Sequence, residues 1–362
     1  LIKKEPLELK GKYDDGRRTQ IEYTADDFDP EDFYPNEDVV ITISHLGYIK
    51  RTSLSEYKLQ NRGGVGSKGS LTRDEDFIEH IYVANMHSTM LFFTAKGKCY
   101  WLKVYNIPEG VKASKGRAIQ NVINIESDDS ICAYINVKNL NDEEYINSHY
   151  VILATKRGVI KKTLLEAYSR PRANGVAAIN IREDDALLEA IQTDGAEDIL
   201  IAARKGRCVR FPEDKARAIG RTATGVRGID IEEDDEVIGM ICIPKDEMET
   251  KNVMAVSANG YGKRSLVSEY RVTNRGGKGV KTLNITEKTG DLIALKAITD
   301  ENDLMIINKS GITIRVPADS IRIAGRATQG VRLISLRDGD EIAAVCPVDK
   351  SEEKPVETGE DL

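Results

Sequence analysis

Glycine and positive charge stand together in the segment Gln60–Gly66, which is followed by Ser67, Lys68 and Gly69. Glycine tolerates positive φ and allows a partner to approach the backbone closely. The exposed amides of such a loop can form an anion-binding concavity, and Arg62 and Lys68 add positive charge beside it. The segment matches neither the P-loop pattern nor the G-x-G-x-x-G pattern. Phosphate is the natural ligand of such a loop, although a glycine-rich basic segment taken alone is more often a plain turn.

The segment is one copy of a repeat, because pairs of glycines at a nearly fixed spacing recur along the chain. The spacing is 19 residues for the pairs that begin at Gly47, Gly97, Gly206, Gly260 and Gly311, and 17 residues from Gly158 to Gly175. Basic residues follow the first glycine of most pairs. An arginine precedes the second glycine by four residues in four units, as Arg62, Arg221, Arg275 and Arg326. A fixed period indicates a repeat architecture.

Each unit reads as four short strands. An apolar run opens the unit, then come a glycine turn, a second strand, the Arg/Gly loop, a short third strand such as 177–181, an acidic turn and a last apolar strand. Short strands separated by turn residues are typical of all-β folds. Six such units predict an all-β, propeller-like ring of six four-stranded blades. The expected blades are approximately 38–85, 86–137, 147–193, 196–244, 251–299 and 302–348.

The charge of the chain is unevenly distributed. The net charge is −7, but residues 1–38 and 349–362 together carry 18 acidic and 8 basic residues, which leaves 44 basic and 41 acidic residues for 39–348. We expect residues 1–37 to form an acidic linker and residues 349–362 to form an acidic, disordered tail. Within the repeats, bases occupy the second strand and the Arg/Gly loop, and acids occupy the later turn. A basic belt on a ring favours a polyanion such as DNA, with ordinary solvated turns as the alternative.

The sequence offers little other chemistry. Five cysteines form no C-x-x-C pair and are expected to be free, buried thiols. Four histidines have no metal-ligand spacing, and the repeated acidic pairs are interpreted as structural turns. We expect no catalytic residue, no metal and no cofactor in this chain. No apolar run is long enough to span a bilayer and no signal peptide is evident, so we expect a cytoplasmic, nucleoid-associated piece of a larger protein.

The glycine-rich segment and the repeats resemble a known family. Residues 60–66 resemble the box Gln-Arg-Arg-Gly-Gly-Lys-Gly of the C-terminal domain of the bacterial DNA gyrase A subunit, and the six repeats resemble the six blades of that family's β-pinwheel, whose blades exchange strands. Lys12–Thr19 is similar to the family's exit from the cleavage core. Asn61 and Val65 depart from the box, whereas Thr273–Gly279 in the fifth repeat is nearly as box-like.

The resemblance implies that duplex DNA runs around the outer rim in a positive wrap and is held through its phosphates, in the service of ATP-dependent negative supercoiling. It also implies a catalytic tyrosine outside this chain, ATP and Mg²⁺ bound by other domains, and a holoenzyme that contains the gyrase B subunit, together with the N-terminal part of the A subunit. The fragment itself is expected to be monomeric. The expected DNA-binding residues are Lys50, Arg51, Gln60, Arg62, Gly63, Gly64, Gly66, Lys68, Lys161, Lys162, Arg207, Arg210, Arg221, Lys263, Arg264, Arg275, Lys278 and Arg326.

Two other functions remain open at this stage. The first is the corresponding domain of the topoisomerase IV A subunit, which serves decatenation. The second is a propeller that acts as a protein-interaction platform, for which no DNA affinity is expected. The near-complete first box and six full repeats favour gyrase over topoisomerase IV, and the recurring arginine favours DNA binding over a protein platform.

Overall fold

A computed structural model describes residues 4–13, 30–44, 46–53, 78–111, 114–310, 312–336 and 339–349. The chain divides into two units, Leu1–Pro35 and Asn36–Leu362. In the first unit the structure describes the helix α1 (Lys4–Tyr13) and the 3₁₀ helix η1 (Pro30–Phe33). The expected acidic linker is described only in these parts. Of the expected disordered tail, only Asp349 lies within the described residues.

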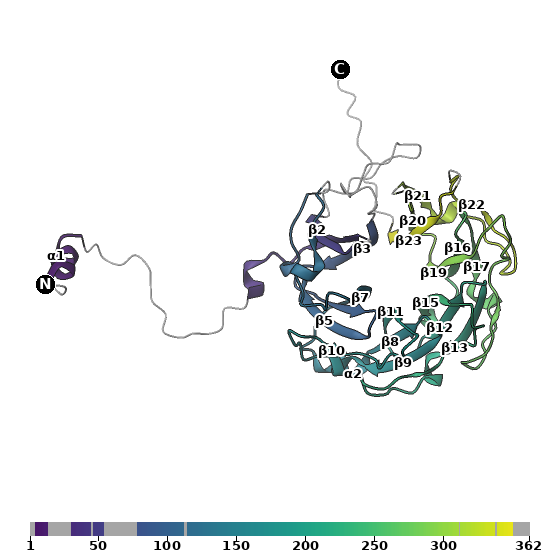
Figure 1. The fold of residues 1–362 in the computed structure, drawn as a ribbon, viewed down its shortest axis with the longest axis horizontal. Coiled ribbons are helices and arrows are strands. Elements are labelled where there is room, and N and C mark those ends of the chain that lie inside the picture. Colours follow the sequence, from purple (N-terminus) through teal and green to yellow (C-terminus); the bar gives the residue numbers. More distant parts are fainter. Residues whose placement is uncertain are drawn as a thin grey trace, which may run out of the picture. The chain divides into compact units, whose positions relative to one another are not determined.

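The second unit is a ring of antiparallel sheets, which confirms the predicted all-β, propeller-like fold (Figure 1). From the centre outwards, the strands of successive blades fall into four layers. The innermost strands are β3 (Ile78–Asn85), β7 (Ile131–Val137), β11 (Leu187–Thr193), β15 (Val237–Ile243), β19 (Leu292–Ile298) and β23 (Ile342–Asp349). The next layer is β1 (Asp38–Ser44), β4 (Thr89–Thr94), β8 (Tyr150–Thr155), β12 (Asp198–Ala203), β16 (Asn252–Ser257) and β20 (Asn302–Asn308).

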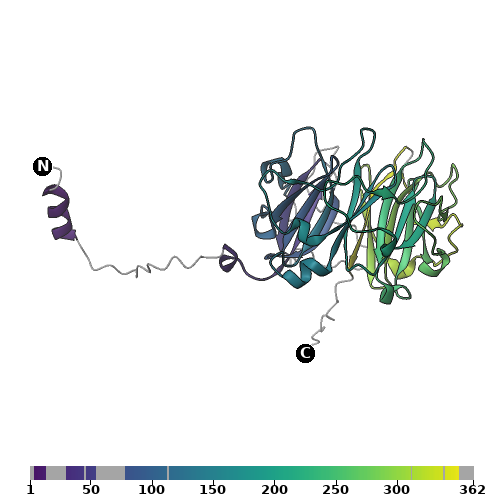
Figure 2. The ribbon, with the colours of Figure 1, turned by 90° about the horizontal axis from the view of Figure 1, so that it is seen from below.

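The third layer is β2 (Tyr48–Ser53), β5 (Lys98–Lys103), β9 (Val159–Leu164), β13 (Arg207–Pro212), β17 (Tyr261–Leu266) and β21 (Thr313–Pro317). The outermost layer is β6 (Arg117–Ala118), β10 (Val176–Ala177), β14 (Val226–Arg227), β18 (Val280–Lys281) and β22 (Val331–Arg332). Short helices connect the strands: α2 (Glu143–Ser148), η3 (Val104–Asn106), η4 (Ile119–Asn121), η5 (Leu165–Tyr168), η6 (Glu213–Lys215), η7 (Lys245–Glu247), η8 (Val267–Glu269) and η9 (Ala318–Ser320). Figure 2 shows the strands running from one face of the ring to the other.

The second-layer strands form the core. All six residues of β4 and of β12 are buried, because each blade packs against a neighbour on both of its faces. A strand that is covered on both faces has a nearly continuous run of apolar residues in its sequence. One core cluster joins Ile152 and Ile160 of the third blade to Ile199 and Phe211 of the fourth. The apolar runs found in the sequence therefore mark the strands that hold neighbouring blades together.

The glycine turns make the hairpins between the second and third layers. Gly97, Gly158, Gly206 and Gly260 adopt φ between 79° and 83°, and each amide donates to a carbonyl three residues earlier. A three-residue hairpin loop of this kind places its last residue in the left-handed region, which glycine occupies without strain. In these four repeats the first glycine is thus required by the backbone of the hairpin.

In the five blades whose outermost strand is described, that strand comes from the following repeat. Val226 of the fourth repeat pairs with Ile160 of the third blade, and Val280 of the fifth repeat pairs with Cys208 of the fourth blade. The glycine before each outer strand passes very close to its neighbour, since a Cβ on Gly279 would overlap the carbonyl group of Cys208. The strand exchange that the family resemblance implied is present, and it explains the second glycine of the repeat.

One expectation about strands needs correction. The third strand of a repeat is only two residues long, as in β10 (Val176–Ala177), because residues 178–181 turn away after this brief pairing. The expected four-stranded blade is confirmed in five sheets; of the sixth, three strands lie within the described residues, in the order β21–β20–β23. At the centre the ring is continuous, since β23 contacts β3.

The acidic turns have a structural role, as the sequence indicated. Asp129 accepts hydrogen bonds from the amides of Lys96 and Ser130. Asp185 does the same for Arg157 and Ala186, and the pattern recurs in the fourth blade. A carboxylate that accepts two backbone N–H bonds fixes the turn beside the hairpin.

Candidate nucleic-acid interface

The lysines at the centre of the third-layer strands are buried. Lys50, Lys161 and Lys263 are at most 2% exposed, and each directs its ammonium group at backbone carbonyl oxygens, at least one of which belongs to the following repeat. Lys50 Nζ donates to the carbonyls of Val111 (3.1 Å) and Ser114 (2.7 Å), Lys161 Nζ to those of Ala178 and Arg221, and Lys263 Nζ to that of Gly325 (2.5 Å). Burial lowers the pKa of Lys161 to about 7, with a further contribution from Arg221, and burial lowers the pKa of Lys263 to about 8.

The next residue of each strand also faces inwards. Lys162 pairs with the fully buried Glu213 at 2.8 Å, and Arg210 pairs with Asp198 at 2.8 Å. Arg264 donates to the carbonyl of Ile321 at 2.7 Å, and Arg51 donates to that of Ile107 at 2.8 Å. The prediction that these strand bases lie at a DNA surface is therefore wrong for seven residues, because they clamp one repeat to the next. They are Lys50, Arg51, Lys161, Lys162, Arg210, Lys263 and Arg264.

The other predicted contacts divide into two groups. Arg207, Arg275 and Lys278 are exposed, and Arg221 and Arg326 are half-buried; all five lie in or beside the Arg/Gly loops that lead into the outermost strands. These five residues stay as candidates. The remainder of the predicted set, Gln60, Arg62, Gly63, Gly64, Gly66 and Lys68, lies outside the described residues.

The recurring arginine joins neighbouring loops. Arg275 Nη1 donates to the carbonyl of Arg227 at 3.1 Å, and Arg326 Nη1 donates to that of Lys281 at 2.9 Å. Each acceptor belongs to the outer strand that the preceding repeat contributes. Since a guanidinium carries five N–H donors, an exposed arginine can hold a carbonyl and still present donors to solvent. Arg275 and Arg326 thus fix the spacing between consecutive loops while contributing positive charge.

Sequence reasoning missed two further basic positions in each of the last three repeats. One stands eight residues before the second glycine and the other two residues after it. All six side chains are exposed. Their fixed offset within the repeat was the signal that could have found them. With the recurring arginine they form a set of nine, here called the outer-edge bases: Arg217, Arg221, Arg227, Arg271, Arg275, Lys281, Arg322, Arg326 and Arg332.

The outer-edge bases are unevenly distributed among the repeats. At the same two outer offsets the second repeat has Pro108 and Ala118, and the third has Ala167 and Ala177. The first repeat carries Lys58 and Lys68 there, although both lie outside the described residues. At these offsets the basic residues of the described part of the ring therefore follow an arc along the loops of the last three repeats. The loops of the second and third repeats carry exposed basic residues at other positions, namely Lys115, Arg117, Arg170 and Arg172.

The loop of the fifth repeat presents bare backbone at this arc. It surrounds a hollow of about 410 Å³ lined by Arg271, Thr273, Asn274, Arg275 and residues 276–279. Gly276 needs its positive φ of 79°, but Gly277 is required neither by φ nor by packing, since an added Cβ would meet only the carbonyl oxygen of Asn274 at 3.8 Å. A glycine without a structural reason, between exposed bases, suits close approach by a large partner.

The bases on the face that carries the hairpin turns are mostly neutralised. In the second blade Lys96 pairs with Asp128 at 2.5 Å. In the fourth, Lys205 pairs with Glu232 at 2.8 Å and Asp234 at 2.5 Å. These contacts raise the pKa of both lysines, chiefly through hydrogen bonds to the carboxylates. Unbalanced positive charge is therefore concentrated at the outer edge.

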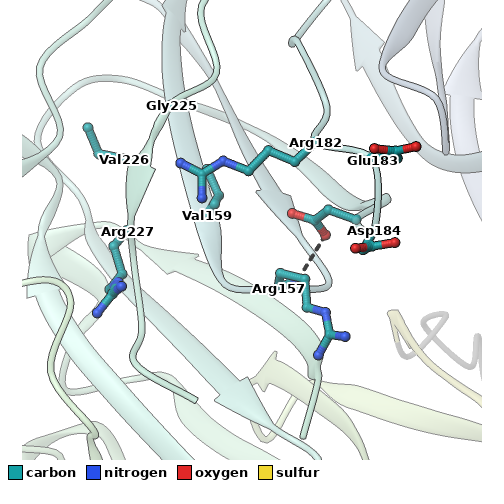
Figure 3. Close-up of a pocket in the computed structure, with 9 residues that line it drawn as sticks. Arg157, Val159, Arg182, Glu183, Asp184, Gly225, Val226 and Arg227 are labelled. Carbon is teal, nitrogen blue, oxygen red and sulfur yellow. Dashed lines mark hydrogen bonds between the residues drawn. The ribbon is translucent and has the colours of Figure 1, made fainter. Parts of the chain in front are cut away.

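The corner between this face and the outer edge is hollowed in the third blade (Figure 3). The hollow of about 410 Å³ is lined by three arginines, Arg157, Arg182 and Arg227, together with Glu183 and Asp184. Arg182 extends over it, whereas Arg157 turns away and donates to the carbonyl of Glu233 at 2.7 Å. Because both signs of charge line it, this hollow is a weaker anion site than the loop of the fifth repeat.

Other chemistry finds little support in the described residues. They contain no group of His, Cys, Asp and Glu that could hold a metal ion. The five cysteines are free, as predicted; Cys99 and Cys208 are buried, and the other three are only partly so. Burial raises the pKa of the Cys99 and Cys208 thiols well above the usual value. No described helix is long and apolar enough to cross a membrane.

Comparison with known proteins agrees with this architecture. The profile of the family described as "DNA gyrase C-terminal domain, beta-propeller" matches six segments, 38–85, 88–132, 149–194, 197–244, 251–299 and 302–349. The DNA gyrase A subunit of Staphylococcus aureus (strain NCTC 8325) is 43% identical over 362 residues, and that of Staphylococcus epidermidis (strain ATCC 12228) is 44% identical over 354 residues. These alignments cover 100% and 98% of this chain. The chain spans only 40% and 39% of the relatives' own length.

Solved structures share the fold. A DNA gyrase A C-terminal domain is 25% identical with a TM-score of 0.72, covering 86% of this chain and 99% of its own. The C-terminal domain of a DNA topoisomerase IV is 23% identical with a TM-score of 0.69, covering 87% of this chain and 94% of its own, and it supports the fold alone. The six matched segments and the full-length alignment show that this chain belongs to the DNA gyrase C-terminal β-propeller family.

Proposed function

We propose that this chain binds duplex DNA without sequence preference and wraps it along the outer edge of the ring. The observation that carries the proposal is the set of nine outer-edge bases, which repeat at three fixed offsets in consecutive loops. Contacts from arginine and lysine to phosphates supply sequence-independent affinity. A repeat of identical basic positions suits a ligand that itself repeats, as a phosphate backbone does.

Wrapping requires that several contacts act together. Smooth bending of 20–30 bp by 40–90° costs of order 1–6 kcal/mol. The loops are held in place before DNA arrives, because Arg275 and Arg326 fasten each loop to its predecessor and Gly276 N donates to the carbonyl of Gly228 at 2.6 Å. A prearranged set of contacts loses less ordering entropy on binding, which leaves more free energy to bend the DNA.

Within a gyrase, the wrapped segment would be presented for strand passage. We propose that the chain serves ATP-dependent negative supercoiling together with the gyrase B subunit, and with the N-terminal part of the A subunit. In that assembly ATP and Mg²⁺ would be bound by other domains, and the catalytic tyrosine would lie outside this chain. The fragment alone would bind DNA without cleaving it, in the cytoplasm where the chromosome lies.

The alternatives have less support. A topoisomerase IV role would fit the fold, but the family profile and the relatives that share 43–44% identity with this chain are those of gyrase. A protein-interaction platform would not need basic residues at the same three offsets of successive loops.

A salt titration tests the proposal. The fragment binds a fluorescent duplex of arbitrary sequence, and log Kobs is measured against log[salt]. If the nine outer-edge bases neutralise about eight phosphates, the slope is roughly −7. A second duplex of unrelated sequence should give the same affinity and slope. Absence of binding at moderate salt would remove the DNA-binding function and leave the interaction platform.

A further inference from the structure

The fifth blade differs from its neighbours at the corner where the outer edge meets the face with the hairpin turns. In the second and fourth blades an acidic turn neutralises the lysines of this corner, and in the sixth blade Lys309 pairs with Glu341 at 2.6 Å. The corresponding turn of the fifth repeat reads Thr286, Glu287, Lys288, Thr289 and Gly290. A lysine therefore replaces an acid at this corner.

Two cations lie around one tyrosine at the corner. Tyr261 of β17 pairs in register with Arg332 of β22, and Arg332 Nη2 donates to the tyrosine hydroxyl at 2.9 Å. Lys288 Nζ lies 5.4 Å from the centre of the Tyr261 ring, within the range of a cation–π contact. Both basic side chains are exposed, whereas Tyr261 is only 7% exposed. The hydrogen bond from Arg332 lowers the pKa of the tyrosine.

The nearby carboxylates do not neutralise this pair. Glu287 and Asp291 are exposed on the same turn, yet within the described residues neither forms an ion pair with Lys288 or Arg332. Lys288 and Arg332 are therefore not held by a carboxylate, unlike Lys205 at the corner of the fourth blade, which pairs with Glu232 and Asp234.

The turn that carries Lys288 is held firmly. Asn259 Nδ2 donates to the carbonyls of Glu287 (3.1 Å) and Lys288 (3.3 Å), and Thr289 Oγ1 accepts from the amide of Thr286 at 2.9 Å. The turn also touches the loop of the sixth repeat, since Gln329 Nε2 donates to Thr286 Oγ1 at 3.3 Å. The corner is therefore a continuation of the basic outer edge.

We propose that Lys288 and Arg332 bind a backbone phosphate of duplex DNA, so that the DNA path leaves the outer edge at the fifth blade and crosses onto the face with the hairpin turns. Tyr261 acts as a positioning residue that orients Arg332 and supports Lys288. This inference rests on the proposed DNA-binding function and extends its site.

The experiment compares Lys288→Ala with Lys205→Ala in the whole fragment, using duplex DNA and a salt titration. Both changes remove one exposed lysine, but Lys205 is already paired with two carboxylates. Removing one phosphate contact should reduce the magnitude of the salt slope by about 0.9, which at 0.1 M salt is roughly an eightfold loss of affinity. Lys288→Ala should show this loss, and Lys205→Ala should not. Tyr261→Phe keeps the ring but removes the acceptor of Arg332, and should weaken binding at unchanged melting temperature.

The outcomes separate the two proposals. If the unmodified fragment does not bind DNA, the proposed function fails. If it binds and Lys288→Ala leaves both affinity and slope unchanged, or if Lys205→Ala weakens binding equally, the corner is not a specific contact and the inference is overturned.

Discussion

Removing the buried ammonium of Lys162 should lower the stability of the ring. It should not reduce the salt slope of DNA binding, as the loss of a phosphate contact would. Lys162 Nζ lies 2.8 Å from Glu213 Oε1, and the two side chains are 7% and 0% exposed. Glu213 also accepts from Thr193 Oγ1 at 2.6 Å and from the amide of Glu197 at 3.2 Å. Lys162→Met would leave the carboxylate buried and without its cation.

Breaking a buried ion pair on one side costs about 3–5 kcal/mol. For a domain of this size each kcal/mol lowers the melting temperature by roughly 2 °C, so Lys162→Met should lower it by about 6–10 °C. The double variant Lys162→Met/Glu213→Gln removes both charges and keeps an acceptor for the Glu197 amide, so it should recover most of this loss. Differential scanning calorimetry measures both.

Lys205→Met is the matched control, because its ion pairs are exposed and such pairs contribute about 0–1 kcal/mol. The reasoning would be refuted if Lys162→Met melted like the unmodified fragment but bound DNA with a reduced salt slope. Lys162 would then be a surface contact after all, as the sequence first suggested.

Three other perturbations test the division between buried and exposed positions. Burial depresses the pKa of Lys161 to about 7, so above that pH the unfolded chain holds a proton on this lysine that the folded chain has lost. The free energy of unfolding should therefore rise from about pH 7 towards pH 10. Lys161→Met should abolish much of this rise, measured as the urea midpoint. Replacing Arg217, Arg271 or Arg322 with glutamine should reduce the magnitude of the salt slope by about 0.9 each, and an unchanged slope would exclude that residue from the contacts. Gly277→Ala should weaken DNA binding at unchanged melting temperature. Gly279→Ala should lose about 1–3 kcal/mol of stability, because Gly279 has a φ of 72° and lies against the Cys208 carbonyl. If the two variants changed DNA binding and melting temperature equally, the assignment of Gly277 to binding and of Gly279 to packing would be contradicted.

The architecture could be predicted from the sequence because the repeat pattern marks the strands and the turns of the blades. The apolar runs 39–43, 90–93 and 199–202 all lie in buried strands, and the first glycine of each pair marks a hairpin. The residues alone did not show that each outer strand is donated to the preceding blade. That pairing depends on contacts such as Val226 with Ile160, which are far apart in the chain.

Predicting the interface was harder, since the sequence does not show whether a basic side chain in a strand faces solvent or a backbone carbonyl. Lys161 and Lys263 looked like contacts because they are charged, but their ammonium groups satisfy loop carbonyls inside the ring. Conversely, Arg271 and Arg322 were not among the predicted contacts. Their exposure became evident only when the loops of successive repeats were placed side by side at the outer edge.

The most direct test of the central claim is the change in linking number when a nicked plasmid is closed by ligase in the presence of the fragment. Wrapping along the outer edge predicts a positive shift that grows with the amount of fragment. The triple variant Arg217→Gln, Arg271→Gln, Arg322→Gln should lose most of that shift while retaining its melting temperature. Binding by the unmodified fragment without any shift would contradict the wrap, and an undiminished shift in the triple variant would contradict the arc of bases proposed to carry it.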